Sequence, residues 1–303
     1  MTLAALRTAF LLAVPVLAGC ESMPALDADS TTVGDAALAQ LSSGAATSSL
    51  GSLPVDDGRY TTGAPRKTWV YSCQSFPSGS GSQSLPWVSG QTWNSKEKVK
   101  VRGTVGWTRS LTIVRRGTQR TISGNGLPGH QTGTFPISPS DPAYEYDQNP
   151  NAIAPQSVSY SIPANPAVAA APSCLNMGPI GIMLTGAQLF NAFDAQGRDA
   201  AVHELLDSCW GHPQQQGAYH YHTFSACMGD SVTGHSKLLG YALDGFGIYG
   251  PRGQDGTVLW SNDLDECHGH AHVIAWNGKR VTMYHYHFTY DFPYSLGCYR
   301  GSP

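Results

Sequence analysis

The sequence has few charged residues and lacks the short motifs of several large enzyme classes. Asp, Glu, Lys and Arg make up 13% of its 303 residues, against roughly 25% in an average soluble domain. It contains no Gly-x-Ser-x-Gly, no phosphate-binding loop and no dinucleotide fingerprint, which argues against a serine hydrolase and against nucleotide chemistry. The formal net charge of -3 argues against nucleic acid as a partner.

Long apolar runs are also missing after the first 20 residues. Residues 1–19 place one positive charge before an apolar run, and Leu17-Ala-Gly-Cys20 resembles the end of a bacterial lipoprotein signal peptide. A membrane-spanning helix fits less well, because the run is short and contains Pro15. We therefore expect lipidation of Cys20 and anchoring in the cell envelope. Glu21, which stands where an inner-membrane protein would have Asp, favours the outer membrane.

Large apolar side chains are scarce from Cys20 to residue 66 as well. This segment consists mainly of Ala, Ser, Thr, Gly and Asp, which cannot bury enough surface to offset chain entropy, so residues 20–66 are predicted to be a flexible tether. Residues 67–303 are enough for one compact domain. Alternating apolar residues predict an antiparallel sheet region at 67–175, and only residues 186–193 and 200–206 favour short helices. The expected fold class is mainly β.

Six cysteines remain besides Cys20. An even number in an exported protein indicates disulfides, here three among 15 possible pairings. The alternative is thiolate ligation of a metal, which the absence of any Cys-x-x-Cys disfavours.

Histidines gather late in the sequence, with ten of the 11 between His203 and His287. Asn277-Gly278 separates two runs of mostly apolar and β-branched residues and predicts a hairpin with a two-residue turn. The register pairs His270 with His285, and alternate residues share that face. The side chains predicted on it are His268, His270, His272, Met283, His285 and His287.

An earlier stretch predicts a similar hairpin. A three-residue loop ends in Gly217, as a type I turn followed by a bulge requires. This loop pairs His212 with His220, and His222 lies further along the same face. In both hairpins a Gly-His histidine therefore faces the first histidine of a Tyr-His-Tyr-His run.

The two hairpins belong to a longer internal repeat, predicted at residues 176–230 and 236–301. Leu206-Asp-x-Cys-x-Gly-His aligns with Leu264-Asp-x-Cys-x-Gly-His. Two copies are too few for a solenoid, so we expect halves packed face to face about a pseudo-twofold axis, with their histidine faces meeting. The repeat favours one disulfide within each copy. The predicted pairs are Cys209–Cys227, Cys267–Cys298 and, by remainder, Cys73–Cys174.

These motifs carry a family resemblance. Tyr219-His-Tyr-His and Tyr284-His-Tyr-His, each after Leu-Asp-x-Cys-x-Gly-His, resemble the YHYH domain family, named for that tetrapeptide. The resemblance extends over residues 120–301 and includes Asn125-Gly-Leu-Pro-Gly-His130. Members of the family are bacterial and mostly exported, and they have no established activity. The resemblance therefore implies export from a bacterial cell but no chemical mechanism.

The spacing of the histidines predicts metal binding. Histidines at i and i+2 of a strand lie roughly 6.6 Å apart on one face and can lean onto one ion. A residue across the ladder, with its Cβ about 5 Å away, supplies a third ligand. The predicted ligand sets are His212, His220 and His222, and His270, His285 and His287. Nitrogen ligands without thiolates suit copper or zinc: His272 and Met283 favour copper, and three imidazoles with an open position are typical of catalytic zinc.

Other interpretations of these residues stay open. The imidazoles can instead be buried hydrogen-bonding groups or metal-free acid–base groups. Weaker candidate ligands are His130, His268 and His272. Asp207 and Asp265 can accept a hydrogen bond from a ligating imidazole and so orient it, or they can make turn hydrogen bonds. His203 and His235 lack counterparts in the repeat and are expected to be ordinary surface or core residues.

The sequence thus predicts an envelope-anchored lipoprotein that binds copper or zinc, for metal handling or for metal-dependent chemistry. The alternative is a metal-free surface module that recognises a saccharide or a peptide in a cleft lined by Tyr and His. Whether the protein is an enzyme is not decided by these motifs. The membrane, reached through the lipid, is its expected partner.

Overall fold

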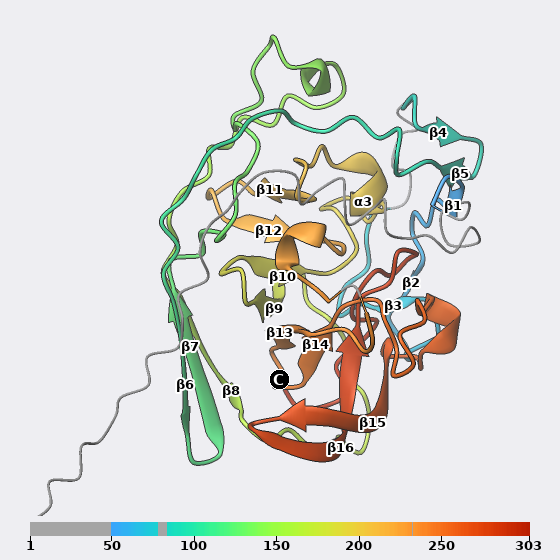
Figure 1. Cartoon of the computed structure of the whole chain (residues 1–303). Coiled ribbons are helices and arrows are strands. Elements are labelled where there is room, and N and C mark those ends of the chain that lie inside the picture. Colours follow the sequence, from blue (N-terminus) through green and yellow to red (C-terminus); the bar gives the residue numbers. More distant parts are fainter. Residues whose placement is uncertain (1–49, 78–83, 232) are drawn as a thin grey trace, which may run out of the picture. The chain divides into compact units, whose positions relative to one another are not determined.

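A computed structural model describes residues 50–77, 84–231 and 233–303 (Figure 1). The predicted signal peptide, Cys20 and most of the predicted tether lie outside these residues. Within them the chain is β-rich, with mostly antiparallel strands, one α-helix and three disulfides, so the predicted fold class is confirmed. No helix in this part of the chain is long and apolar enough to cross a bilayer.

The largest element is one eight-stranded sheet with the order β11-β12-β10-β9-β13-β14-β16-β15. Its strands are β9 (Pro179–Met183), β10 (Gln188–Phe190), β11 (Gly211–Pro213), β12 (Tyr219–Tyr221), β13 (Leu238–Ala242), β14 (Gly247–Tyr249), β15 (Gly269–Trp276) and β16 (Lys279–His287). Both predicted histidine hairpins, β11–β12 and β15–β16, lie at its two ends.

The two halves of this sheet repeat one pattern of strand pairing. In the first half Leu189 pairs in parallel with Tyr221, and in the second half Ile248 pairs in parallel with Tyr286. The halves join edge to edge, because β9 and β13 are hydrogen-bonded antiparallel neighbours. The expected face-to-face packing is therefore wrong, and the two histidine faces do not meet. That the halves arose by internal duplication stays a prediction.

A smaller antiparallel sheet packs beside the large one (Figure 1). It consists of β6 (Leu111–Arg116), β7 (Gln119–Gly124) and β8 (Val158–Pro163). Ile122, Val158 and Ile162 of this sheet form an apolar cluster with Ile182 of β9. The antiparallel strands predicted within residues 67–175 are thus confirmed here.

Residues 50–66 are more ordered than their composition indicates. Short strands pair as β1 (Leu53–Pro54) with β5 (Thr92–Trp93), β5 with β4 (Val88–Ser89), and β2 (Tyr60–Thr61) with β3 (Val70–Tyr71). Leu50 and Leu53 are buried in the main core, and Asp57 contacts the ring of His203 at 3.0 Å. The predicted end of the tether is therefore wrong, because a few buried leucines and polar bonds hold residues 50–66 on the domain.

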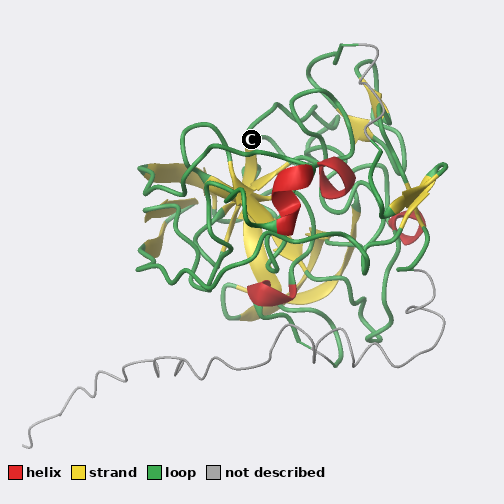
Figure 2. Ribbon diagram, turned by 90° about the horizontal axis from the view of Figure 1, so that it is seen from above, coloured by secondary structure: helices red, strands yellow, loops and turns green. Residues whose placement is uncertain are grey.

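Helical structure is brief, as Figure 2 shows. The α-helix is α3 (Ala200–His203), and 3₁₀ turns occur at Pro142–Glu145, Ala226–Met228 and Ser261–Asp263. The first residues of the helix expected at 200–206 are confirmed. The helix expected at 186–193 is wrong, because residues 188–190 pair with β9 and β12 and bury Leu189 in the sheet.

The three predicted disulfides are all confirmed. Cys209–Cys227 closes a loop that contains the whole hairpin β11–β12. Cys267–Cys298 closes a loop that contains β15–β16. Each histidine hairpin is therefore held by its own covalent link, while Cys73–Cys174 ties the N-terminal region to the segment before β9.

Candidate metal centres

Both hairpins have the predicted register. His212 lies opposite His220, and His270 lies opposite His285. The turn at Asn277-Gly278 has positive φ at both residues, 50° and 77°, which is the backbone that favours an Asn-Gly pair. Sequence-local turn chemistry therefore aligns the imidazoles across each ladder.

Two histidine clusters result, each able to hold a metal ion. The nitrogens that each cluster offers all lie within 4.8 Å of one another. The first cluster is His212, His220 and His222. The second cluster is His235, His270, His272, His285 and His287.

In the second cluster, four of the five rings place Nδ1 against a backbone carbonyl oxygen. The pairs that involve Nδ1 are His235 with Ser236 O at 2.8 Å, His272 with Val273 O at 3.2 Å, His285 with Met283 O at 3.0 Å and His287 with Gly250 O at 2.6 Å. A carbonyl oxygen only accepts, so each of these Nδ1 atoms carries the proton and donates. The lone pair of each of these four rings is then on Nε2, where it can bind a metal ion.

The five Nε2 atoms of the second cluster are buried and have no hydrogen-bond partner. A buried polar atom without a partner costs free energy, and native structures contain few of them. One cation that accepts their lone pairs could satisfy all five atoms together.

His235, His270, His285 and His287 are neutral near neutral pH, as ligands must be, because their pKa values are lowered. Burial, together with the neighbouring histidines, lowers the pKa of His285 to about 3 and that of His270 to about 4. Burial also lowers the pKa of His287 and of His235. These four rings therefore do not need to lose protons before they bind an ion.

In the first cluster, as in the second, rings donate from Nδ1 to backbone carbonyls and turn Nε2 toward one another, but there are only three rings. Nε2 of His222 lies 3.0 Å from Nε2 of His220 and 3.4 Å from Nε2 of His212. Nδ1 of His220 donates to Ala218 O, and Nδ1 of His222 donates to Asn191 O. Two Nε2 lone pairs thus face each other. Nitrogens bound to one tetrahedral zinc are about 3.3 Å apart, a value between the two distances measured here.

A carboxylate lies behind the first cluster. Oε2 of Glu204 is 3.6 Å from Nδ1 of His212, and this Nδ1 has no closer hydrogen-bond partner. Burial raises the pKa of Glu204 to about 7. A carboxylate on the back nitrogen of a ligating histidine is a common device that orients the ring and raises its basicity.

The clusters differ in access to solvent. All three rings of the first cluster are buried, whereas His235, His270 and His272 of the second cluster are half-buried. Burial lowers the pKa of each ring in the first cluster, that of His222 to about 4.

Two histidines are not where the sequence placed them. His268 has φ 71°, donates from Nδ1 to the carbonyl of His287 and lies with Nε2 3.1 Å from the hydroxyl of Ser261, so it is outside the second cluster. His235, expected to be ordinary, is in the cluster. It comes from the loop before β13, outside the hairpin, and its one sequence signal is the Gly234 that precedes it as Gly precedes His212 and His270.

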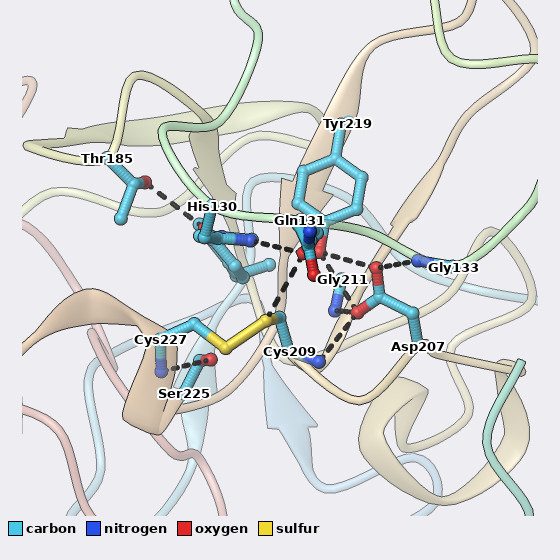
Figure 3. The surroundings of a disulfide bond; sticks show 11 residues. His130, Gln131, Gly133, Thr185, Asp207, Cys209, Gly211, Tyr219, Ser225 and Cys227 are labelled. Carbon is cyan, nitrogen blue, oxygen red and sulfur yellow. Dashed lines mark hydrogen bonds between the residues drawn. A yellow bond between two sulfur atoms is a disulfide. The ribbon is translucent and has the colours of Figure 1, made fainter. Parts of the chain in front are cut away.

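His130, a weaker candidate, is outside both clusters and lies beside the Cys209–Cys227 disulfide (Figure 3). Its Nδ1 donates to Gln131 O at 2.8 Å, and its Nε2 lies 2.5 Å from the hydroxyl of Tyr221. The two sulfurs nearby are bonded to each other, so they are not thiolate ligands. His272, also a weaker candidate, is in the second cluster.

Asp207 and Asp265 bind the opposite face of the hairpins. Asp207 accepts the hydroxyl of Tyr219 and backbone N–H groups of residues 133, 209 and 211. Asp265 accepts the hydroxyl of Tyr284 and the N–H groups of residues 267 and 269. The structure favours hydrogen bonds to turns and tyrosines over the imidazole-orienting role also expected for Asp207 and Asp265, and both tyrosines are buried.

The sequence comparisons agree with the motifs. A family described as YHYH protein matches residues 159–262. The resemblance to the YHYH family is confirmed. The matched stretch contains Tyr219-His-Tyr-His and the whole first cluster, and it ends before Tyr284. No curated protein matches the chain, and no solved structure does.

Proposed function

We propose that this protein binds transition-metal ions at its two histidine clusters and serves metal handling or metal-dependent chemistry. The observation that carries the proposal is the group of five buried Nε2 atoms without partners in the second cluster. Hydrogen-bonding architecture alone would supply a donor to each of those atoms. Four of the five rings are instead anchored through Nδ1, which leaves their Nε2 atoms for an ion.

Copper and zinc are the metals that the ligand type supports. Both clusters offer imidazole nitrogens and no free thiolate, because all six described cysteines are in disulfides. Imidazole suits copper and zinc, whereas calcium and magnesium prefer oxygen ligands. Met283, considered as a soft ligand, packs on the apolar cluster of Tyr249, Ile274 and Trp276.

The cellular setting is part of the proposal. A lipid on Cys20 would anchor the domain to the envelope, with the outer membrane as the favoured site. Three disulfides support folding in an oxidising compartment. Labelling of the full chain with a radioactive fatty acid, compared with a Cys20→Ser variant, tests the anchor.

A second candidate function rests on a separate cavity of about 150 Å³. Its walls include Trp93, Trp210, Phe224 and Tyr290 and contain no histidine. A cavity of that size holds a small ring, so a metal-free module that binds a small aromatic or sugar ring is the alternative.

Elemental analysis of protein folded in an oxidising compartment and purified without a His tag tests the metal proposal. The expected result is copper or zinc near one ion per cluster. The matched control changes His220 and His222 of the first cluster and His270, His285 and His287 of the second to Gln, which leaves one and two ligands, respectively. If the protein takes up neither metal from solutions of both, or if the control binds as much, the proposal fails and the cavity becomes the better candidate.

A further inference from the structure

We infer that the second cluster is a five-nitrogen site for one Cu(II)-type cation and that His235 is its fifth ligand. The inference rests on the proposed function and adds the coordination number, the metal class and a ligand from outside the Tyr-His-Tyr-His hairpin. It also assigns different metals to the two clusters.

The size of the cluster fits one ion. All five coordinating nitrogens lie within 4.8 Å of one another. Two nitrogens on opposite sides of one ion, each bonded at about 2.0–2.1 Å, are separated by about 4 Å. Small movements of the rings therefore bring all five nitrogens into a single coordination sphere.

His235 has the position of a ligand. Its ring centroid lies 4.8 Å from that of His272, 5.1 Å from that of His287 and 5.5 Å from that of His285. Its Nδ1 donates to Ser236 O, so its buried and unpartnered Nε2 carries the lone pair.

The backbone beside His235 is held by a polar anchor. The hydroxyl of Ser236, which is buried, donates to a carboxylate oxygen of Asp230 at 2.7 Å. The hydroxyl of Ser231 donates to the carbonyl of His235 at 3.1 Å. The ring is thus placed over the hairpin by bonds that do not use its own Nε2, as expected of a preorganised ligand.

The number of nitrogens distinguishes copper from zinc. Zinc has no geometric preference from its d electrons and is almost always four-coordinate and tetrahedral in protein sites. Cu(II) takes tetragonal nitrogen surroundings and binds nitrogen sites more tightly than zinc does. Five imidazoles therefore favour Cu(II) at the second cluster, whereas three buried imidazoles leave the first cluster suited to tetrahedral zinc.

The test uses the mature protein with His222→Gln, which leaves only two imidazoles in the first cluster and so weakens its metal binding. Metal-free protein is titrated with Cu(II), examined by electron paramagnetic resonance and then challenged with excess Zn(II). A His235→Ala variant is compared with His203→Gln, a histidine outside both clusters whose ring contacts Asp57. We expect one Cu(II) per chain with nitrogen superhyperfine lines, retention against Zn(II), and at least tenfold weaker binding with an altered spectrum for His235→Ala alone.

The other outcomes separate this inference from the proposed function. Displacement of Cu(II) by Zn(II), two Cu(II) ions per chain, or an unchanged affinity and spectrum in His235→Ala would overturn the five-nitrogen copper site and leave metal binding intact. Absence of any Cu(II) or Zn(II) binding in this background, together with none in the protein with both clusters intact, would overturn both.

Discussion

The two ends of the large sheet carry the same type of histidine hairpin, but the histidines of the first are buried and some of those of the second are partly exposed. Each presents a Gly-His histidine opposite a Tyr-His-Tyr-His strand, and each is closed by a disulfide. The first cluster has three rings and is fully covered, whereas the second has five and reaches the surface. One local motif therefore specifies the register of the histidines, and its surroundings decide how many rings meet and how far each cluster is open to solvent.

The covering of the first cluster comes from outside its hairpin. Phe190 stacks on His220 with ring centroids 3.9 Å apart. Asn149 donates to the carbonyl of Pro213, and the backbone N–H of Ala154 donates to Gly217, so a loop segment lies along β11. The corresponding edge strand β15 is eight residues long and leaves Val273 40% exposed.

The largest effect expected is loss of one ion from a single substitution. His220→Ala leaves two imidazoles and should empty the first cluster, whereas His285→Ala leaves four and should weaken binding at the second cluster at least tenfold. Neither change should affect the other cluster, because the clusters share no ligand. Both variants should remain folded, since disulfides hold the hairpins. Metal content and melting curves measured together check this. Both variants could instead retain all their metal and lose only free energy of unfolding, by about 1–3 kcal/mol for a hydrogen-bonding partner left unsatisfied. That result would show that the histidines stabilise the fold and do not bind metal.

The next effect concerns the disulfide around the first cluster. Replacing Cys209 and Cys227 by Ser should lower the free energy of unfolding by about 3 kcal/mol, the chain-entropy value for a loop of this length. Because the loop carries every ligand of the first cluster, metal affinity should fall there and stay unchanged at the second. Urea unfolding and metal titration measure the two effects. Equal weakening at both clusters would show that the halves do not act separately.

A smaller effect is expected from acid. In the unfolded chain His222 takes up its proton near pH 6.5, whereas in the metal-free folded protein burial lowers its pKa to about 4. Between these values the unfolded state holds more protons, so falling pH destabilises the fold, by at most about 3 kcal/mol for this one group. A His222→Gln variant should lose stability less steeply between pH 6.5 and pH 4. Parallel slopes would contradict the burial of a neutral ring.

The local parts of the site were predictable from sequence, and the long-range parts were not. The Asn277-Gly278 turn and alternation along a strand suffice to align His270 with His285, and the repeat suffices to pair the cysteines. His235 reaches its cluster through the packing of a loop, which leaves no periodic signal. The edge-to-edge contact of β9 with β13 and the burial of residues 188–190 as a strand also depend on partners distant in sequence.

The smallest effect tests why the first cluster, despite fewer ligands, should hold its ion well. Oε2 of Glu204 lies 3.6 Å from Nδ1 of His212, close enough for a small adjustment to form the hydrogen bond that orients this ring. Glu204→Gln keeps the shape and removes the charge, so we expect about tenfold weaker metal binding at the first cluster, the lower end for such partners. The second cluster, measured in the same titration, is the internal control. A change of less than twofold at the first cluster would mean that enclosure, and not the carboxylate, compensates for the missing ligands.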